Sequence, residues 1–384
     1  MPKANAANAR IKREYFTYLK EAQRRDESSI DAVAKALARF EEANRHKDFK
    51  TFHRAQAVAF KHKLDKQPAV RSGKPLSRAT VNSTLSALRA FFVWLAGQPG
   101  YKSRLSYADA DYFNLAEKYV RIAKAARHKA FPSLEQVHHV IAAMSTGTDI
   151  ELRNRALIAF TLLTGARDGA LATFRLKHVD LAQSRVDQDA RDVNTKASKT
   201  FETWFFPVGG NAIQIVQDWC EHLRTGLLWS DQDPLFPPTQ IGLGENGGFV
   251  PVGLRRGECW HGAGPIRDIF RNAFTAAGLP YFNPHSLRDT LVQLGEQVCT
   301  TPEQFKAWSQ NLGHSRVMTT LTSYGTVAPH RQAELIRGLG MTGDTASRAP
   351  ATLDPALIAQ VVAFMQNLPG KELPNSLATS RTRC

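Results

Sequence analysis

Apolar residues in the first third of the chain recur at the spacing of a helix. The clearest series runs between Ser77 and Gly97, with steps of four, three, four and three between its members: Val81, Leu85, Leu88, Phe92 and Leu95. These steps place the side chains on one stripe that faces a core. Ser77 is suited to cap such a helix, and Gly97 followed by Pro99 ends it. Similar spacing predicts that residues 11–124 are mainly helical.

Beyond residue 130 the pattern changes, and helices alternate with short strands. Ser133, with Gln136 three residues later, predicts a capped helix through Met144, and an apolar run predicts a second helix over residues 150–164. β-branched and aromatic segments predict strands at 179–181, 184–187 and 203–208. Further helices are expected at 211–223, 264–276, 286–298, 302–309 and 317–323. The expected fold class is therefore mainly α with a small antiparallel β-sheet.

The length of the chain, 384 residues, is too great for one typical domain. We interpret the basic segment 121–129 as a linker, which gives a helical domain at 1–128 and a second domain at 129–340. Residues 341–384 are expected to hold a polar linker, a helix at 354–367 and a disordered tail. The apolar face of that helix needs a docking surface, either on its own domain or on a neighbouring subunit.

The net charge of +15 is confined to the first third of the chain. Residues 1–130 contain 27 Lys and Arg against 12 Asp and Glu, whereas residues 131–384 contain 23 of each kind. A basic module of this size suits a polyanion, and the commonest one is nucleic acid. A solvated, highly charged helical surface is the alternative.

Several other functions lack their sequence signals. The glycine-rich segment Gly242–Gly248 has no following Gly-Lys-Ser/Thr, so we expect an exposed loop and no phosphate-binding loop. The cysteines are widely spaced without a Cys-x-x-Cys pair, which favours reduced thiols over a metal site. No apolar run approaches the roughly 18 residues of a membrane span, and the N-terminus has no apolar signal core. A cytoplasmic protein is expected.

Four short motifs offer the chemistry for cleaving a phosphodiester without a metal. They are Thr164-Gly165-Ala166-Arg167, His285-Ser286-Leu287-Arg288, Leu312-Gly313-His314, and Tyr324 preceded by Thr319-Thr320. Arginine and histidine donors neutralise charge on a phosphorane, and a tyrosine can store the bond energy in a covalent intermediate. His285 and Arg288 lie three residues apart, so on a helix both side chains fall on one face.

These motifs, in this order, resemble those of the tyrosine site-specific recombinases of the phage integrase family. The resemblance covers about residues 130–340, and the helical N-terminal module more loosely. It implies an N-terminal helical core-binding (SAM-like) domain followed by an α+β catalytic domain. It also implies site-specific cleavage and rejoining of double-stranded DNA by a homo-tetramer on paired sites, in the cytoplasm at the nucleoid. No metal, ATP or other cofactor is implied.

The resemblance also implies a role for each candidate residue. Tyr324 attacks the scissile phosphate and forms a 3′-phosphotyrosyl link. Arg167, Arg288 and His314 bind the oxygens of that phosphate. His285 accepts the tyrosine proton, and a lysine on a β-hairpin protonates the leaving 5′-oxygen.

The lysine is Lys196 or Lys199, and we favour Lys199 because Ser-Lys-Thr a short way before a strand is closer to the family pattern. Two departures from that pattern leave other functions open. Ala170 stands where the family usually has an acidic residue, and the spacing from His314 to Tyr324 is one residue longer than usual. A catalytically impaired DNA-binding protein is therefore one alternative. A type IB topoisomerase-like relaxing enzyme, which would share the chemistry, is another.

Overall fold

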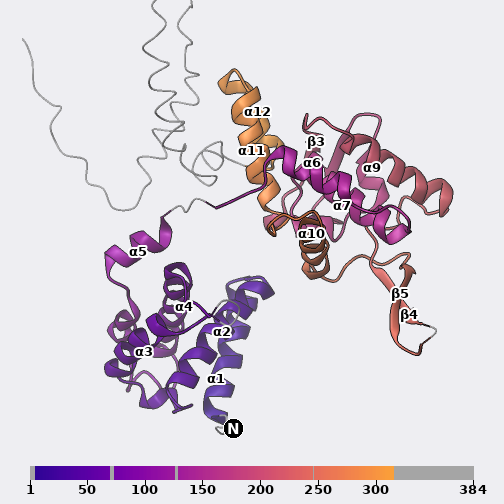
Figure 1. Ribbon diagram of the computed structural model, residues 1–384. Coiled ribbons are helices and arrows are strands. Elements are labelled where there is room, and N and C mark those ends of the chain that lie inside the picture. Colours follow the sequence, from indigo (N-terminus) through magenta and orange to yellow (C-terminus); the bar gives the residue numbers. More distant parts are fainter. Residues whose placement is uncertain (1–4, 70–72, 126–128, 245, 315–384) are drawn as a thin grey trace, which may run out of the picture. The chain divides into compact units, whose positions relative to one another are not determined.

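The computed structural model describes residues 5–69, 73–125, 129–244 and 246–314 (Figure 1). The chain divides into two units, residues 1–325 and 326–384, and the second lies wholly outside the described residues. The helices expected at 317–323 and 354–367 also lie outside them. The domain boundaries inferred from the sequence remain predictions.

One apolar core lies within residues 11–113 and is built by helices. The elements of this part are α1 (Ala6–Thr17), η1 (Tyr18–Ala22), α2 (Glu27–Ala43), η2 (Phe49–Thr51), α3 (Arg54–Lys66), α4 (Arg78–Ala96), η3 (Tyr107–Phe113) and α5 (Glu117–Lys124). Helix α5 continues through Lys124, so the basic segment 121–129 begins within a helix.

Helix α4 is the helix that the apolar stripe predicts. Ser77 Oγ accepts a hydrogen bond from the Thr80 amide at 3.1 Å, and Gly97 is the C-cap, so both predicted ends are confirmed. The stripe residues are at most 2% exposed. Phe92 packs against Phe52 and Phe113, with ring centroids 4.3 and 5.0 Å away, so the core is largely aromatic.

A second apolar core lies within residues 137–312. Its helices are α6 (Leu134–Ala143), α7 (Asp149–Thr164), α8 (Asp168–Leu171), η4 (Leu176–His178), η5 (Lys196–Ser198), α9 (Ala212–Glu221), η6 (His222–Gly226), α10 (Gly264–Ala276), α11 (Ser286–Val298) and α12 (Pro302–Asn311). Its strands are β1 (Val179–Asp180), β2 (Arg185–Gln188), β3 (Phe201–Trp204), β4 (Thr239–Leu243) and β5 (Phe249–Leu254). Strands β1, β2 and β3 form an antiparallel sheet in that order, and β4 pairs with β5 alone. The expected fold class is confirmed.

The bounds of one expected strand were wrong. The strand expected at 203–208 covers residues 201–204, because the Phe206 amide donates to the Leu163 carbonyl at 2.8 Å and leaves the sheet. Phe206 is then buried in the core. The β4–β5 hairpin was not predicted. Gly242 and Leu243 end β4, whereas Gly244, Gly247 and Gly248 lie in the loop between the strands, as expected for that part of the segment 242–248.

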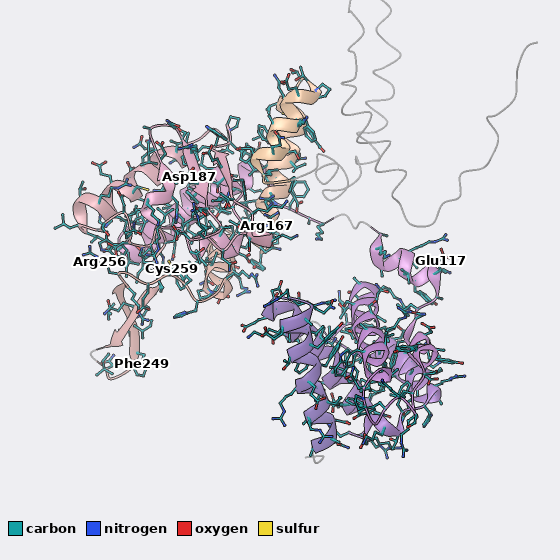
Figure 2. All side chains as sticks on the ribbon, turned by 180° about the vertical axis from the view of Figure 1, so that it is seen from behind. Glu117, Arg167, Asp187, Phe249, Arg256 and Cys259 are labelled. Carbon is teal, nitrogen blue, oxygen red and sulfur yellow. The ribbon has the colours of Figure 1, made fainter. Side chains whose placement is uncertain are left out.

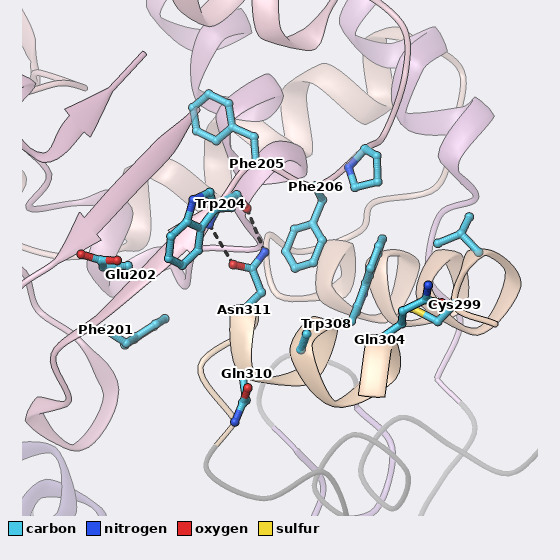
Figure 3. Close-up of a pocket in the computed structure, with 13 residues that line it drawn as sticks. Phe201, Glu202, Trp204, Phe205, Phe206, Cys299, Gln304, Trp308, Gln310 and Asn311 are labelled. Atoms are coloured by element: carbon cyan, nitrogen blue, oxygen red, sulfur yellow. Dashed lines mark hydrogen bonds between the residues drawn. The ribbon is translucent and has the colours of Figure 1, made fainter. Parts of the chain in front are cut away.

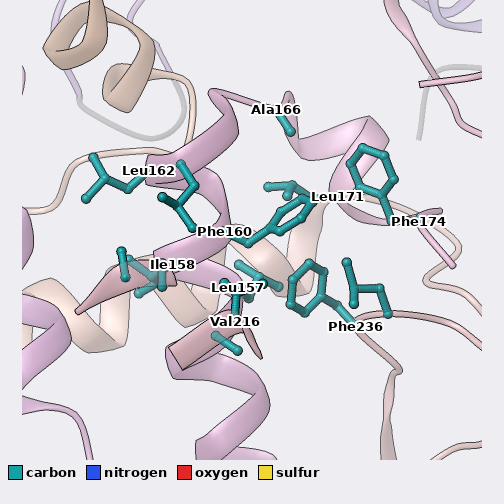
Figure 4. Close-up of a cluster of buried hydrophobic side chains, with 14 of the residues drawn as sticks. Leu157, Ile158, Phe160, Leu162, Ala166, Leu171, Phe174, Val216 and Phe236 are labelled. Atoms are coloured by element: carbon teal, nitrogen blue, oxygen red, sulfur yellow. The ribbon is translucent and has the colours of Figure 1, made fainter. Parts of the chain in front are cut away.

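Helix α7 runs through the second core, and its C-terminal half is buried on every side. Leu157, Ile158, Phe160 and Leu162 are 0% exposed, and they pack among side chains that include Leu171, Phe174, Val216 and Phe236 (Figure 4). Burial all round fixes the end of α7, from which the first arginine motif continues. Among the described residues, no helix combines the length and the apolar character needed to cross a bilayer.

Candidate active site

The first arginine motif turns sharply at Gly165. Its φ of 59° is left-handed, and a Cβ atom there would lie 2.9 Å from Leu312 Cδ2 and 3.0 Å from Leu291 Cδ1. Both the backbone angle and the close packing therefore require glycine. The turn places Arg167, which is half-buried, at the N-cap of α8 (Figure 2).

Arg288 connects three of the four motifs. It lies on α11, is only 2% exposed, and donates through Nη1 to the Gly165 carbonyl at 2.6 Å. Its Nη2 atom donates to the Leu312 carbonyl at 2.5 Å and lies 2.9 Å from His314 Nε2. A guanidinium has no acceptor, so His314 Nε2 accepts this bond and the neutral ring carries its proton on Nδ1.

The loop that carries His314 is held by strand β3. Gly313 has a φ of 72°, and a Cβ atom there would lie 2.6 Å from Phe201 Cζ. The Asn311 side chain accepts from the Trp204 amide and donates to the Trp204 carbonyl, both at 2.8 Å (Figure 3). His314 is 7% exposed at the end of this support.

Both histidines are neutral at neutral pH. His285 is exposed at the N-cap of α11, yet desolvation by the residues around it, followed by the charges of Arg288 and Arg167, lowers its pKa to about 4. Desolvation and the same two arginines lower the pKa of His314 to about 3. Because the charges of Arg167 and Arg288 act on both histidines, the four residues form one electrostatic site.

The two candidate lysines lie on the segment between β2 and β3, and both are exposed. Lys196 begins η5 and Lys199 follows it, with left-handed φ values of 58° at Ala197 and 49° at Ser198 between them. The charge of Lys196 is among those that lower the pKa of His314. This hairpin therefore brings a lysine charge to the arginine and histidine cluster.

Ala170, which stands where the family usually has an acidic residue, is surrounded by apolar side chains. Ala170 is 1% exposed and belongs to the second core. Asp168 turns away to α10, where its carboxylate accepts from Arg267 Nε at 2.7 Å. The sequence did not single out Asp289, whose pKa is raised to about 6 by burial while Lys129 and Arg288 oppose the shift. Its position directly after Arg288 was the only available signal.

Tyr324 lies outside the described residues, as does the Thr319-Thr320 pair. Within the described residues, no group of three or more His, Cys, Asp and Glu side chains is arranged to hold a metal ion. Arg167, His285, Arg288 and His314 instead offer cationic and neutral hydrogen-bonding groups, which suit an anionic oxygen.

Comparison with known proteins agrees with these motifs. A family model described as the N-terminal SAM-like domain of phage integrase matches residues 13–98. The tyrosine recombinase XerC of Salmonella typhi is 32% identical over 171 residues, which cover 44% of this chain and 49% of the relative. XerC of Halalkalibacterium halodurans is 24% identical over 245 residues, which cover 64% of this chain and 70% of the relative. Over these stretches the chain is similar to phage integrases and tyrosine recombinases. Its match therefore spans about half the length of the first of these relatives.

Two solved structures share the fold of this chain. A lambda integrase (75–356) dimer bound to a COC′ core site aligns with a TM-score of 0.55 at 12% identity, covering 89% of this chain and 99% of that one. The XerH site-specific recombinase bound to difH substrate aligns with a TM-score of 0.52 at 17% identity, covering 87% and 85%. The predicted combination of a SAM-like N-terminal domain and a mainly helical fold is confirmed.

An apolar groove of about 700 Å³ lies beside strand β3 (Figure 3). Trp204, Phe206, Val298 and Trp308 are among the side chains that line it. Trp204 is 50% exposed and Val298 is 47% exposed. Asn311 also lines the groove, and it lies three residues before His314, the last described residue of the chain.

Proposed function

We propose that this chain is a site-specific recombinase or integrase that cleaves and rejoins DNA strands through Tyr324. The observation that carries the proposal is the set of hydrogen bonds from Arg288 to Gly165, Leu312 and His314. Through them, motifs far apart in the sequence form one positively charged site. Such a site fits a phosphodiester whose negative charge grows during attack.

The proposed reaction begins when the Tyr324 oxygen attacks phosphorus and the bond to the 5′-oxygen breaks. Arg167 and Arg288 stabilise the non-bridging oxygens, and His314 donates from Nδ1. A tyrosine has an ordinary pKa of about 10, so it needs a base, and neutral His285 accepts its proton. Lys199 then protonates the leaving 5′-oxygen, with Lys196 as the alternative. Attack by a 5′-hydroxyl of another strand reverses these steps and releases Tyr324.

Double-stranded DNA is the proposed partner. The excess positive charge lies in residues 1–130, which include the SAM-like match, and phosphate contacts from Lys and Arg would make binding strongly dependent on salt. Action on chromosomal or mobile DNA would place the protein in the cytoplasm at the nucleoid.

We further propose a homo-tetramer on two DNA sites. The predicted helix at 354–367 would join its subunits by binding in the groove beside β3. The groove is apolar, and the chain continues for 70 residues beyond His314, which includes that helix. Binding to the groove of its own domain is the alternative arrangement.

The decisive experiment detects the covalent intermediate. Purified full-length protein is mixed, in chelator, with nicked duplexes covering the DNA that flanks its gene, and denaturing gels are searched for a protein–DNA adduct. We expect an adduct with the parent and with Tyr281→Phe, but none with Tyr324→Phe. Tyr281 is a suitable control because it is exposed and lies over Arg271, 4.9 Å from ring centroid to guanidinium.

The buried position of Ala170 favours one second candidate, a DNA-binding protein with impaired catalysis. DNA binding by the parent without any adduct would support that function. Relaxed circles without recombinants would instead support the topoisomerase-like alternative, but the curated relatives reported above are named recombinases.

A further inference from the structure

The β4–β5 hairpin exposes an apolar face that the proposed reaction does not use. Ile241 is 50% exposed, Leu243 is 72% exposed and Phe249 is 82% exposed. Leu243 pairs with Phe249 and Ile241 with Pro251 in the antiparallel register, so these side chains share one face. Figure 1 shows the hairpin standing away from the helices, and Figure 2 shows Phe249 at its far end.

The base of the hairpin is firmly anchored. Arg153 is 2% exposed and donates to the Pro237 carbonyl at 2.7 Å and to Thr239 Oγ1 at 3.1 Å. Its guanidinium also lies 5.2 Å from the Trp260 ring centroid. Burial lowers the pKa of Arg153 to about 10. A buried cation bonded to the first residue of β4 holds the hairpin in one direction, which suits a surface that meets a partner.

The hairpin carries no basic side chain that would favour DNA or an anionic membrane. Its strands, residues 239–243 and 249–254, contain no charged residue. Arg153 at the base is buried, and the two arginines that follow β5 along the chain are paired: Arg255 lies 3.0 Å from Glu258, and Arg256 lies 3.2 Å from Asp233. Phosphate contacts and anionic lipid surfaces both require available cations, so an apolar protein surface is the better partner.

We propose that this face, Ile241, Leu243 and Phe249, packs against the same face of a second copy of the chain. A twofold axis places each side chain near its own counterpart, so a charged face would repel itself, and this face is uncharged. An isolated two-stranded hairpin is also only marginally stable in water, and packing against another hairpin covers its apolar side.

The exposed area indicates how strong this association is. The exposed fractions of the three side chains amount to on the order of 400 Å² per copy. Two copies would bury on the order of 800 Å², below the size of a standard stable interface, so the contact is weak and reversible. It therefore forms mainly where copies are concentrated, and it does not depend on strand cleavage.

Sedimentation velocity of the full chain without DNA, over about 1–500 µM, tests the proposal. We expect the parent to associate with a midpoint of about 10–100 µM. Leu243→Ser/Phe249→Ser should raise that midpoint at least about tenfold. The control Val250→Ser/Val252→Ser changes the opposite face, where Val250 is 41% exposed and Val252 is 54% exposed, and it should behave like the parent.

Three outcomes would overturn the proposal. The parent could remain monomeric throughout the range, or the Leu243 and Phe249 variant could associate like the parent. The parent could also bind vesicles of phosphatidylcholine and phosphatidylglycerol in a way that this variant loses, which would assign the face to lipid. Thermal unfolding of each variant shows that it is folded. Because the sedimentation experiment contains no DNA, its result does not depend on whether the protein cleaves DNA through Tyr324.

Discussion

The Arg288 guanidinium donates a hydrogen bond to the Gly165 carbonyl at 2.6 Å, across 123 residues of sequence. This bond joins the helix of the second arginine to the turn that precedes Arg167. The same side chain reaches the Leu312 carbonyl and His314. Arg288 therefore both builds the site and supplies one of its charges.

Replacing Arg288 with lysine should damage both stability and cleavage. Lysine keeps the charge but cannot reach three acceptors in different directions, so buried carbonyls would lose their donors. We expect a loss of roughly 2–4 kcal/mol in the free energy of unfolding and at least about 100-fold in adduct formation. Arg267→Lys is the control, because that arginine is exposed, and its unfolding energy should change by about 0.5 kcal/mol or less. Equal effects of the two substitutions would contradict the structural role of Arg288.

Gly165→Ala should destabilise the protein by roughly 2–3 kcal/mol, because it combines a left-handed φ with a clash against Leu312. Gly278→Ala separates the two causes. Its φ is 73°, but nothing lies within 4 Å of the new Cβ, so only the backbone cost of about 1 kcal/mol is expected. Urea denaturation of both variants measures the difference. Equal losses would mean that the packing of Gly165 against Leu312 is unimportant.

His314 should make stability fall as pH falls. Its pKa in the folded protein is about 3, below the ordinary 6.5, so the unfolded chain binds a proton first. The contribution of neutral His314 is fully present above about pH 6.5 and is lost progressively as pH approaches 3. Denaturation midpoints at pH 7 and pH 5 measure it. His314→Gln should show a smaller drop between these pH values than the parent, and an unchanged drop would contradict the assignment.

Cleavage should tolerate mild acid. A histidine base with the ordinary pKa of 6.5 would be half protonated at pH 6.5. His285, with a pKa of about 4, would still be almost entirely neutral at pH 6.5. We therefore expect the single-turnover rate of adduct formation to change little with the protonation of His285 until pH falls below about 5. His285→Gln should form the adduct about 100-fold more slowly, and its rate should not show the fall below about pH 5 that is expected for the parent. A limb centred near 6.5 in the parent would show that His285 is not shielded as described.

The two hairpin lysines can be distinguished by the leaving group. Lys199→Ala should slow cleavage by about 100-fold or more on an ordinary phosphodiester. A substrate with sulfur in place of the leaving 5′-oxygen needs no protonation, so it should restore most of the rate. Lys196→Ala is the matched comparison, because its charge acts on His314. Rescue of the Lys196 variant alone would transfer the role of general acid to Lys196.

Local patterns in the sequence were enough to predict most helices. Ser77 and Ser133 cap the helices that they were expected to cap, because capping depends only on residues within one turn. The placement of His285 and Arg288 on one helix end followed from their spacing. The order of the motifs likewise indicated the resemblance to tyrosine recombinases without any knowledge of the distances between them.

The sequence by itself determined the positions of most helices, the fold class, the resemblance to tyrosine recombinases and the concentration of charge in the first 130 residues. Only the tertiary structure decided that β3 ends at Trp204, because the competing acceptor for Phe206 is the distant Leu163 carbonyl. It also decided that β4 and β5 form an exposed hairpin. Apolar side chains on this hairpin are exposed, so the sequence lacks the alternation of buried apolar and exposed polar residues that usually indicates a strand. The burial of Arg288 and the lowered pKa values of His285 and His314 likewise depend on residues far apart in the chain. Periodicity and capping act over a few residues, whereas desolvation and hydrogen bonds between motifs act only after the chain has folded.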